Sequence, residues 1–169
     1  QSIDTIFSTE GKMEWITSEA AAGVPQIQVG SFVPPKLLPQ MADSAEVVKQ
    51  SIAIPGLIVS ALAPNLKGAE NAMAAGAHQV GIVMSVSEAH NMSNVRRTTQ
   101  DSLDDFARIV DFRDAHPEYK DVCLSGGMAT AFGCTISGPV PLADVMRVAE
   151  GLLARGADRL SVADTVGYA

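Results

Sequence analysis

Six polar side chains stand at, or just after, short apolar runs of the sequence. They are Gln28, Ser31, Asn94, Cys134, Ser161 and Asp164. A carboxylate can orient a substrate or a general base, and hydroxyl and amide groups can hydrogen-bond a substrate carboxylate, thioester or amide. Each also has a plain structural alternative, since Asp and Asn favour turns, a loop Ser bonds to nearby backbone, and a lone Cys is commonly a small buried hydrophobe. Residue types alone therefore permit substrate binding or acid–base chemistry without naming a substrate or a reaction.

The sequence shows no metal or nucleotide motif. His78, His90 and His116 are not spaced as ligands of one metal ion. Neither G-x-G-x-x-G after the first strand nor G-x-x-x-x-G-K-[ST] occurs. Cys123 and Cys134 form neither a C-x-x-C motif nor a dense disulfide framework, which favours a reducing compartment.

The segments that must position these residues follow a repeated pattern. In three places a helical pattern ends at a glycine, a few small or polar residues follow, and a short apolar run comes next. The glycines are Gly23, Gly76 and Gly156. Glycine is the usual residue just past a helix C-terminus, because it adopts positive φ at little cost. Short apolar runs suit parallel strands that are buried on both faces.

Helical and strand patterns alternate strictly along the chain. We predict helices over 9–22, 43–53, 65–75, 98–115 and 141–155, and strands over 26–31, 57–62, 79–84, 121–126 and 159–164. The expected N-caps are Ser8 or Thr9, Ser44, Asn65 and Thr98. Alternation of this kind means a parallel sheet with right-handed crossovers, either a doubly wound open sheet or part of a (β/α)8 barrel.

Loop lengths distinguish the two ends of this sheet. The links from helix to strand are short, whereas long segments follow three strands, over 32–42, 85–97 and 127–140. Barrel enzymes keep their chemistry in the loops at the carboxyl ends of the strands. The candidate residues are therefore expected at that end.

Composition limits the partners and the size. With 47% hydrophobic and 18% charged residues, the 169-residue chain can bury a core, and its net charge of −7 argues against nucleic acid or an anionic membrane as partner. No apolar run reaches the ~18 residues of a membrane span. Eight units of about 34 residues would need roughly 250 residues or more, so about five-eighths of a barrel is expected here.

Several collinear segments resemble the hydroxymethylglutaryl-CoA lyase family and together cover essentially the whole chain. The longest is QVGSFVPPKLLPQMAD over 28–43, which looks like the family signature. The others are Ala63–Gly68, Ser87-Glu88 with Asn94, Gly133-Cys134, and Ser161 with Asp164-Thr165-Val166-Gly167.

This resemblance implies an α/β fold, a partial (β/α)8 TIM barrel of about five parallel βα units. It implies one incomplete domain over 1–169 that lacks the first strand and the last barrel strands. The implied reaction is a Mg2+- or Mn2+-dependent retro-Claisen cleavage of 3-hydroxy-3-methylglutaryl-CoA to acetyl-CoA and acetoacetate, as in leucine degradation and ketone body metabolism. Asp164 and Gln28 would be catalytic. Ser31, Ser161, Asn94 and Cys134 would bind substrate.

The resemblance also shows what to expect of the metal. In the family an Arg-Asp-Gly-Leu run precedes the Gln that Gln1 matches, and a His-x-His pair follows strand 159–164. The protein ligands of the divalent metal are thus expected to be missing from this chain, which would be inactive alone. Departures from the family pattern bear on the acyl group more than on the fold. They are Gln28 for Glu, Ser125 and Gly127 for Arg and Tyr, and Ile3 and Asp4 for Glu and Lys.

Two other functions stay open at this point. One is a related condensing enzyme of the isopropylmalate or citramalate synthase type, although the loop over 31–43 favours the lyase. The other is a non-catalytic partial barrel. For the lyase we expect an acyl-CoA substrate, no nucleic-acid or membrane partner, a homo-oligomer, most simply a dimer, and a location in the bacterial cytoplasm or the mitochondrial matrix.

Overall fold

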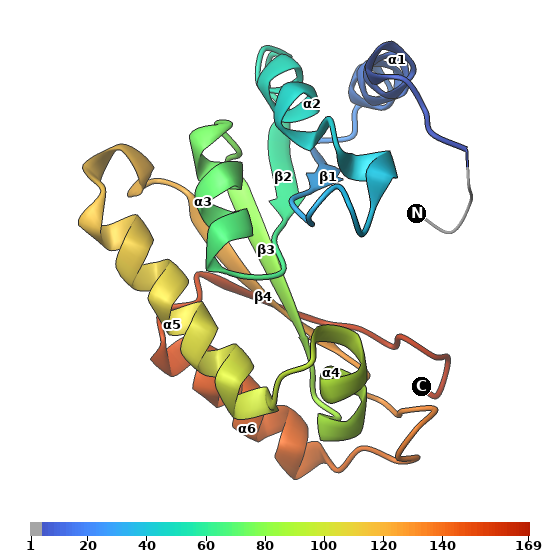
Figure 1. Cartoon of the computed structure of the whole chain (residues 1–169), viewed down its shortest axis with the longest axis vertical. Coiled ribbons are helices and arrows are strands. Elements are labelled where there is room, and N and C mark those ends of the chain that lie inside the picture. The colour runs from blue at the N-terminus through green and yellow to red at the C-terminus, as the bar shows by residue number, and fades with distance from the viewer. Residues whose placement is uncertain (1–4) are drawn as a thin grey trace. The chain divides into compact units, whose positions relative to one another are not determined.

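Helices and strands alternate along the computed structural model, which describes residues 5–169 (Figure 1). The strands are β1 Gln26–Ser31, β2 Ile58–Leu62, β3 Gln79–Ser85, β4 Cys123–Ala129 and β5 Arg159–Val162. The helices are α1 Thr9–Ala21, α2 Ser44–Ser51, α3 Leu66–Ala74, α4 Glu88–Val95, α5 Thr99–Ala115 and α6 Leu142–Ala154, with short 3-10 turns at Pro39–Met41 and Pro117–Tyr119. All ten predicted elements are present, and the strand order is β1-β2-β3-β4-β5.

The first of two compact units ends at Val80. In it β1 and β2 pair in parallel, with Gln26 opposite Ile58 and Ser31 opposite Leu62. The register is irregular between Gln28 and Gly30. Helix α2 packs against both β1 and α1. Apolar side chains of α2, β2 and α3 are fully buried and form the core of this unit; they include Val47, Val48, Val59, Ala69 and Ala72.

The second unit, Gly81–Ala169, has the same construction. Strands β4 and β5 pair in parallel, from Ser125 opposite Arg159 to Met128 opposite Val162. Helices α5 and α6 lie side by side (Figure 1). The buried side chains between helices and strands include Phe106, Ile109, Leu124, Val148 and Leu152.

Most of the helix caps and helix-ending glycines that the sequence predicted are present in the structure. Ser8, Asn65 and Thr98 cap α1, α3 and α5, each accepting a backbone N–H in the first turn. The repeat glycines Gly23, Gly76 and Gly156 have φ of 92°, 94° and 89°. No helix within residues 5–169 is both long and apolar enough to cross a membrane.

Two local predictions were wrong. Asp43 occupies the N-cap position of α2, where Ser44 was expected, because the Ser44 hydroxyl bonds to the end of β1 instead. The segment 85–97 was predicted as a loop, yet it contains α4. Ser87 caps this helix by accepting the N–H of His90, and the chain leaves it at Arg96, whose φ is 57°.

Candidate active site

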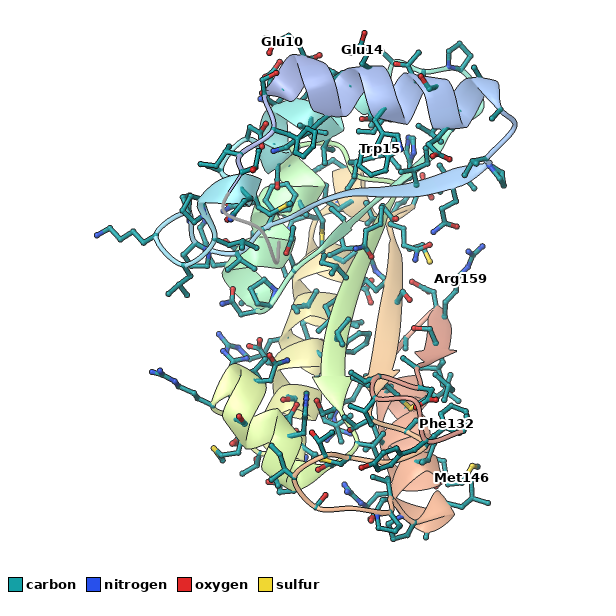
Figure 2. The ribbon with its side chains drawn as sticks, turned by 90° about the vertical axis from the view of Figure 1, so that its right-hand side faces the viewer. Glu10, Glu14, Trp15, Phe132, Met146 and Arg159 are labelled. Carbon is teal, nitrogen blue, oxygen red and sulfur yellow. The ribbon has the colours of Figure 1, made fainter. Side chains whose placement is uncertain are left out.

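Strand β1 carries Gln28 at its middle and Ser31 as its last residue. Gln28 is exposed, and it lines a cavity of about 590 Å³ together with residues of α1 that include Trp15, which extends from that helix (Figure 2). Ser31 is buried, and both its backbone N–H and its carbonyl bond to the Ser44 hydroxyl, at 3.2 and 3.0 Å. The end of β1 is therefore tied to the first residue of α2.

A glycine allows this close approach. A Cβ added at Gly30 would lie 2.8 Å from Ser44 Oγ and 3.0 Å from Ser44 Cβ. Contacts that short do not occur in well-packed proteins, so one partner would have to move. Gly30 thus fixes how near α2 can lie to the strand end that carries Ser31.

An ion pair anchors the loop that follows β1. Lys12 Nζ lies 2.5 Å from Asp43 Oδ1 and donates to the carbonyl of Gln40 at 2.7 Å. Thr9 Oγ1 donates to Asp43 Oδ2 at 2.8 Å. Burial raises the pKa of Asp43, but hydrogen bonds from Lys12 and Thr9 and the charge of Lys12 outweigh it, and the pKa lies below its usual value.

In the second unit, hydrogen bonds join the ends of β3, β4 and β5. The backbone N–H of Val86 donates to the carbonyl of Ala129 at 2.9 Å, and that of Ala131 to the carbonyl of Ala163 at 3.2 Å. Between them lies Thr130, which is fully buried and has a φ of 55°. A β-branched residue in this conformation is a genuine outlier, and such strain costs on the order of 1–3 kcal/mol.

Cys134 lies in the loop after β4. Its side chain is fully buried, its backbone forms an isolated bridge with Gly138, and its Sγ accepts the N–H of Ile136 at 3.3 Å. Burial opposes ionisation, but hydrogen bonds from Ser137, Ser87 and the backbone lower the thiol pKa to about 7. The thiol is therefore more acidic than expected for a buried cysteine that only packs as a small hydrophobic residue.

Asp164 is exposed after β5 and organises the turn that follows. Its carboxylate accepts the N–H groups of Gly167, Tyr168 and Ala169 at 2.9, 2.9 and 3.0 Å. The backbone N–H of Ala169, then that of Tyr168, lowers its pKa, since both stabilise the charged form. Asp164 thus has the turn-forming role that the sequence analysis gave as its structural alternative. A carboxylate held in one orientation can also position a substrate.

Ser161 and Asn94 are exposed. A Cβ added at Gly127 on β4 would lie 3.4 Å from Ser161 Oγ and 3.0 Å from Val83 Cγ2, so β3, β4 and β5 present these positions side by side. Asn94 lies on α4, where no hydrogen bond of its side chain is formed within the described residues. Its neighbour Asn91 is the fully buried amide of this helix, and it bonds the backbone of Ser85.

Sequence reasoning missed a pair at the end of β3. Ser85 Oγ lies 2.7 Å from Nδ1 of His90, which is half-buried. The only sequence signal is a Ser at a strand end followed five residues later by a His.

The six residues predicted from sequence are divided between the two units. Gln28 and Ser31 share one strand of the first unit, and the other four lie in the second unit; they are Asn94, Cys134, Ser161 and Asp164.

Comparison with known proteins names the family. The sequence model described as HMGL-like matches residues 1–169. The chain belongs to the HMGL-like family. It is 34% identical over 162 residues to the hydroxymethylglutaryl-CoA lyase YngG of Bacillus subtilis, covering 96% of this chain and 53% of that protein. It is 37% identical over 156 residues to a 3-hydroxy-3-isohexenylglutaryl-CoA/hydroxymethylglutaryl-CoA lyase of Pseudomonas aeruginosa, covering 92% and 51%.

A solved structure confirms the fold of this HMGL-like chain. It is a hydroxymethylglutaryl-CoA lyase of Acinetobacter baumannii in complex with coenzyme A and 3-methylmalate, with a TM-score of 0.89 and 32% identity. The match covers all of this chain and 54% of the other. The predicted partial (β/α)8 barrel of five parallel βα units is therefore confirmed, and the chain spans about half the length of the curated relatives it matches.

The described residues do not fit the divalent metal that the HMGL-like family implies. Within residues 5–169, no three or more His, Cys, Asp or Glu side chains cluster as metal ligands would. The ring of His78 bonds the N–H of Val59, and His116 bonds the carbonyl of Phe112. No chemical step is therefore assigned to a metal here.

The departures from the family pattern differ in their surroundings. At Gly127 a larger side chain would press on Val83, so the family's Tyr would require Val83 to move. Ser125 is buried in β4. Gln28 keeps the hydrogen-bonding capacity of the family's Glu but carries no charge. Ile3 and Asp4 lie outside the described residues.

Proposed function

We propose that this chain is part of a hydroxymethylglutaryl-CoA lyase-like enzyme that cleaves a 3-hydroxy-3-methylglutaryl-CoA-type thioester to acetyl-CoA and a 3-oxoacid. The observation that carries the proposal is the collinear run of family segments, most of which follow the carboxyl ends of the strands. Relatives named as such lyases match the chain over nearly its whole length. Strand ends are where barrel enzymes bind and transform substrates.

The cleavage is a retro-Claisen reaction. A general base removes the proton of the tertiary hydroxyl, and the oxygen electrons form the carbonyl of the 3-oxoacid. The carbon–carbon bond next to that centre breaks, and its electron pair passes to the thioester as an enolate. Protonation of the enolate carbon gives acetyl-CoA. The divalent metal that the family implies would polarise the substrate oxygens when bound, but no set of ligands for it is found within residues 5–169.

Asp164 is assigned the principal role among these residues. Three backbone N–H groups fix its carboxylate, and its lowered pKa keeps it ionised at neutral pH. It would orient the substrate hydroxyl or the base that takes the proton. Gln28 would act in catalysis as a neutral hydrogen-bonding group.

The other candidates would bind substrate. The hydroxyls of Ser31 and Ser161 suit a carboxylate or thioester oxygen, Asn94 suits an amide of the pantetheine arm, and Cys134 would line the site. One solved relative holds coenzyme A, which supports an acyl-CoA partner. One relative is named for a longer isohexenyl substrate, so an acyl group other than methylglutaryl belongs to the same proposal.

For the complete protein we further propose a single barrel domain, a homodimer, and a place in the bacterial cytoplasm or mitochondrial matrix. Residues 1–169 alone are proposed to be inactive, since the family's metal ligands are not among those described.

The test is a cleavage assay on the full-length protein with 3-hydroxy-3-methylglutaryl-CoA and Mg2+. We expect the 3-oxoacid to form, and we expect Asp164→Asn to lower kcat by ~10²-fold or more. Asp111→Asn is the matched control, because Asp111 is exposed on α5. Condensation of a 2-oxoacid without thioester cleavage would instead establish the synthase alternative, and full activity of Asp164→Asn would remove Asp164 from the site.

A further inference from the structure

Thr130 is the most constrained residue of the second unit. It follows β4 directly, is fully buried, and has a φ of 55°. Within residues 5–169, Arg96 is the other non-glycine residue with positive φ, and it is an exposed helix C-cap. A strained conformation persists only where surrounding interactions over-determine it, and such residues cluster at functional sites.

Three hydrogen bonds hold Thr130 in place. Its Oγ1 accepts the backbone N–H of Ser87 at 3.2 Å and donates to the carbonyl of Ala129 at 2.7 Å. Its own N–H donates to Thr165 Oγ1 at 2.8 Å. One buried residue thereby links the segment after β3, the end of β4 and the segment after β5.

Each linked segment leads to a candidate site residue. On one side, Ser87 Oγ lies 3.0 Å from Ser137 Oγ, and the hydroxyls of Ser137 and Ser87 lower the pKa of the Cys134 thiol. Ser87 also caps α4, the helix that carries Asn94. On the other side, Thr165 directly follows Asp164.

We propose that Thr130 is a positioning residue of the lyase site, an inference that rests on the proposed function. Its left-handed backbone and its hydroxyl set the place of the Cys134 loop relative to the Asp164 turn. Thr130 touches no reacting atom; it acts through Ser87 and Thr165.

The residue type fits this role. Glycine would adopt the conformation without strain but would lose the Oγ1 bonds, and valine has nearly the same shape but no hydroxyl. Serine keeps both bonds of the hydroxyl. Replacing Thr130 by glycine, valine or serine therefore tells the effect of its hydrogen bonds apart from the effect of its shape.

The kinetic test uses the full-length protein. We expect Thr130→Val to lower kcat about tenfold with KM changed less than twofold, because small displacements of positioned groups act on the transition state. Thr130→Ser should restore most of that loss, and Thr135→Val, at an exposed threonine of the same loop, should have no effect. An unchanged kcat in Thr130→Val, or an equal loss in Thr130→Ser, would overturn the proposal.

A second measurement does not depend on lyase activity. Isotope-labelled cysteine allows the Cys134 thiol to be titrated by NMR, with its resonance assigned by its loss in Cys134→Ser. We expect Thr130→Val to raise the thiol pKa from about 7, because Ser87 loses its anchor, while Thr130→Ser and Thr135→Val leave it unchanged. That shift in a protein without lyase activity would refute the proposed function and uphold the positioning role. An unshifted titration would refute the positioning role in either case.

Discussion

The strand ends of the two units are held by different forces. At the end of β1, a glycine lets α2 pack directly on the strand, and the Lys12–Asp43 ion pair anchors the following loop. At the ends of β3, β4 and β5, backbone N–H groups and side-chain hydroxyls bond to one another around Thr130. The first arrangement depends on shape and charge, and the second on a network of hydrogen bonds.

This difference predicts different responses to change. Packing tolerates almost no added volume, because protein interiors are as dense as organic crystals. A hydrogen-bond network tolerates small shifts but is sensitive to the loss of one donor or acceptor and to protonation. Ser31 should therefore be rigid and insensitive to pH near neutrality, whereas Cys134 should respond to pH.

The largest expected effect is at Gly30. Gly30→Ala places a Cβ 2.8 Å from Ser44 Oγ and 3.4 Å from its Cα, so α2 must move and the Ser44–Ser31 bonds weaken. We expect the free energy of unfolding to fall by about 2–3 kcal/mol in chemical denaturation. Gly11→Ala is the control: its Cβ would have 3.6 Å to the nearest side chain within a helix, and it should stabilise by about 0.5–1 kcal/mol. Equal stabilities of the two variants would show that packing does not hold this strand end.

The sequence was sufficient for the fold, because its signals are local and mutually consistent. Glycines after three of the helical patterns, capping residues before three of them, and buried apolar runs each specify one kind of element. Ser44 was mistaken for a cap because its hydroxyl has a tertiary partner on β1 that no local pattern reveals. Helix α4 was missed because eight residues with one buried side chain, Asn91, carry no apolar stripe.

The site was less accessible to sequence reasoning. Family segments pointed to Cys134 and Asp164, but the pKa of the Cys134 thiol is lowered by Ser137 of the same loop and also by Ser87, which lies in another segment of the chain. Thr130 gave no signal at all, since threonine is not a residue expected at positive φ. The assignment of all six candidates to catalysis or substrate binding remains a prediction; they are Gln28, Ser31, Asn94, Cys134, Ser161 and Asp164.

A smaller effect is expected at Asp43. Its pKa lies below the usual value, so it stabilises the fold above the unfolded-state pKa, and this contribution is lost as pH falls through the lower folded-state pKa. Asp43→Asn should therefore cost about 1–2 kcal/mol at neutral pH and progressively less in acid. Lys67→Met, which removes an exposed pair with Glu70, should cost little at any pH. A pH-independent difference between wild type and Asp43→Asn would exclude the ion pair as the anchor.

The smallest expected effect is at Cys134 in the second unit, and it appears near neutral pH, whereas the Asp43 effect changes in acid. The Cys134 pKa of about 7 lies below that of an unfolded thiol, ~8.5, so the folded state binds fewer protons between these values. Ionisation therefore stabilises the protein above the unfolded pKa, and the gain disappears as pH falls through about 7.

Stability curves at pH 6 and pH 8 measure this contribution. Wild type should gain about 1 kcal/mol over Cys134→Ser across that interval, since one pKa unit corresponds to about 1.4 kcal/mol. Cys123→Ser is the matched control, because burial, then the charge of Asp158, raises the pKa of Cys123 and keeps it neutral in this range. If Cys123→Ser removed the pH dependence and Cys134→Ser kept it, the hydroxyl network would not act on the Cys134 thiol. The proposed difference between the end of β1, held by packing, and the ends of β3, β4 and β5, held by hydrogen bonds, would then be wrong.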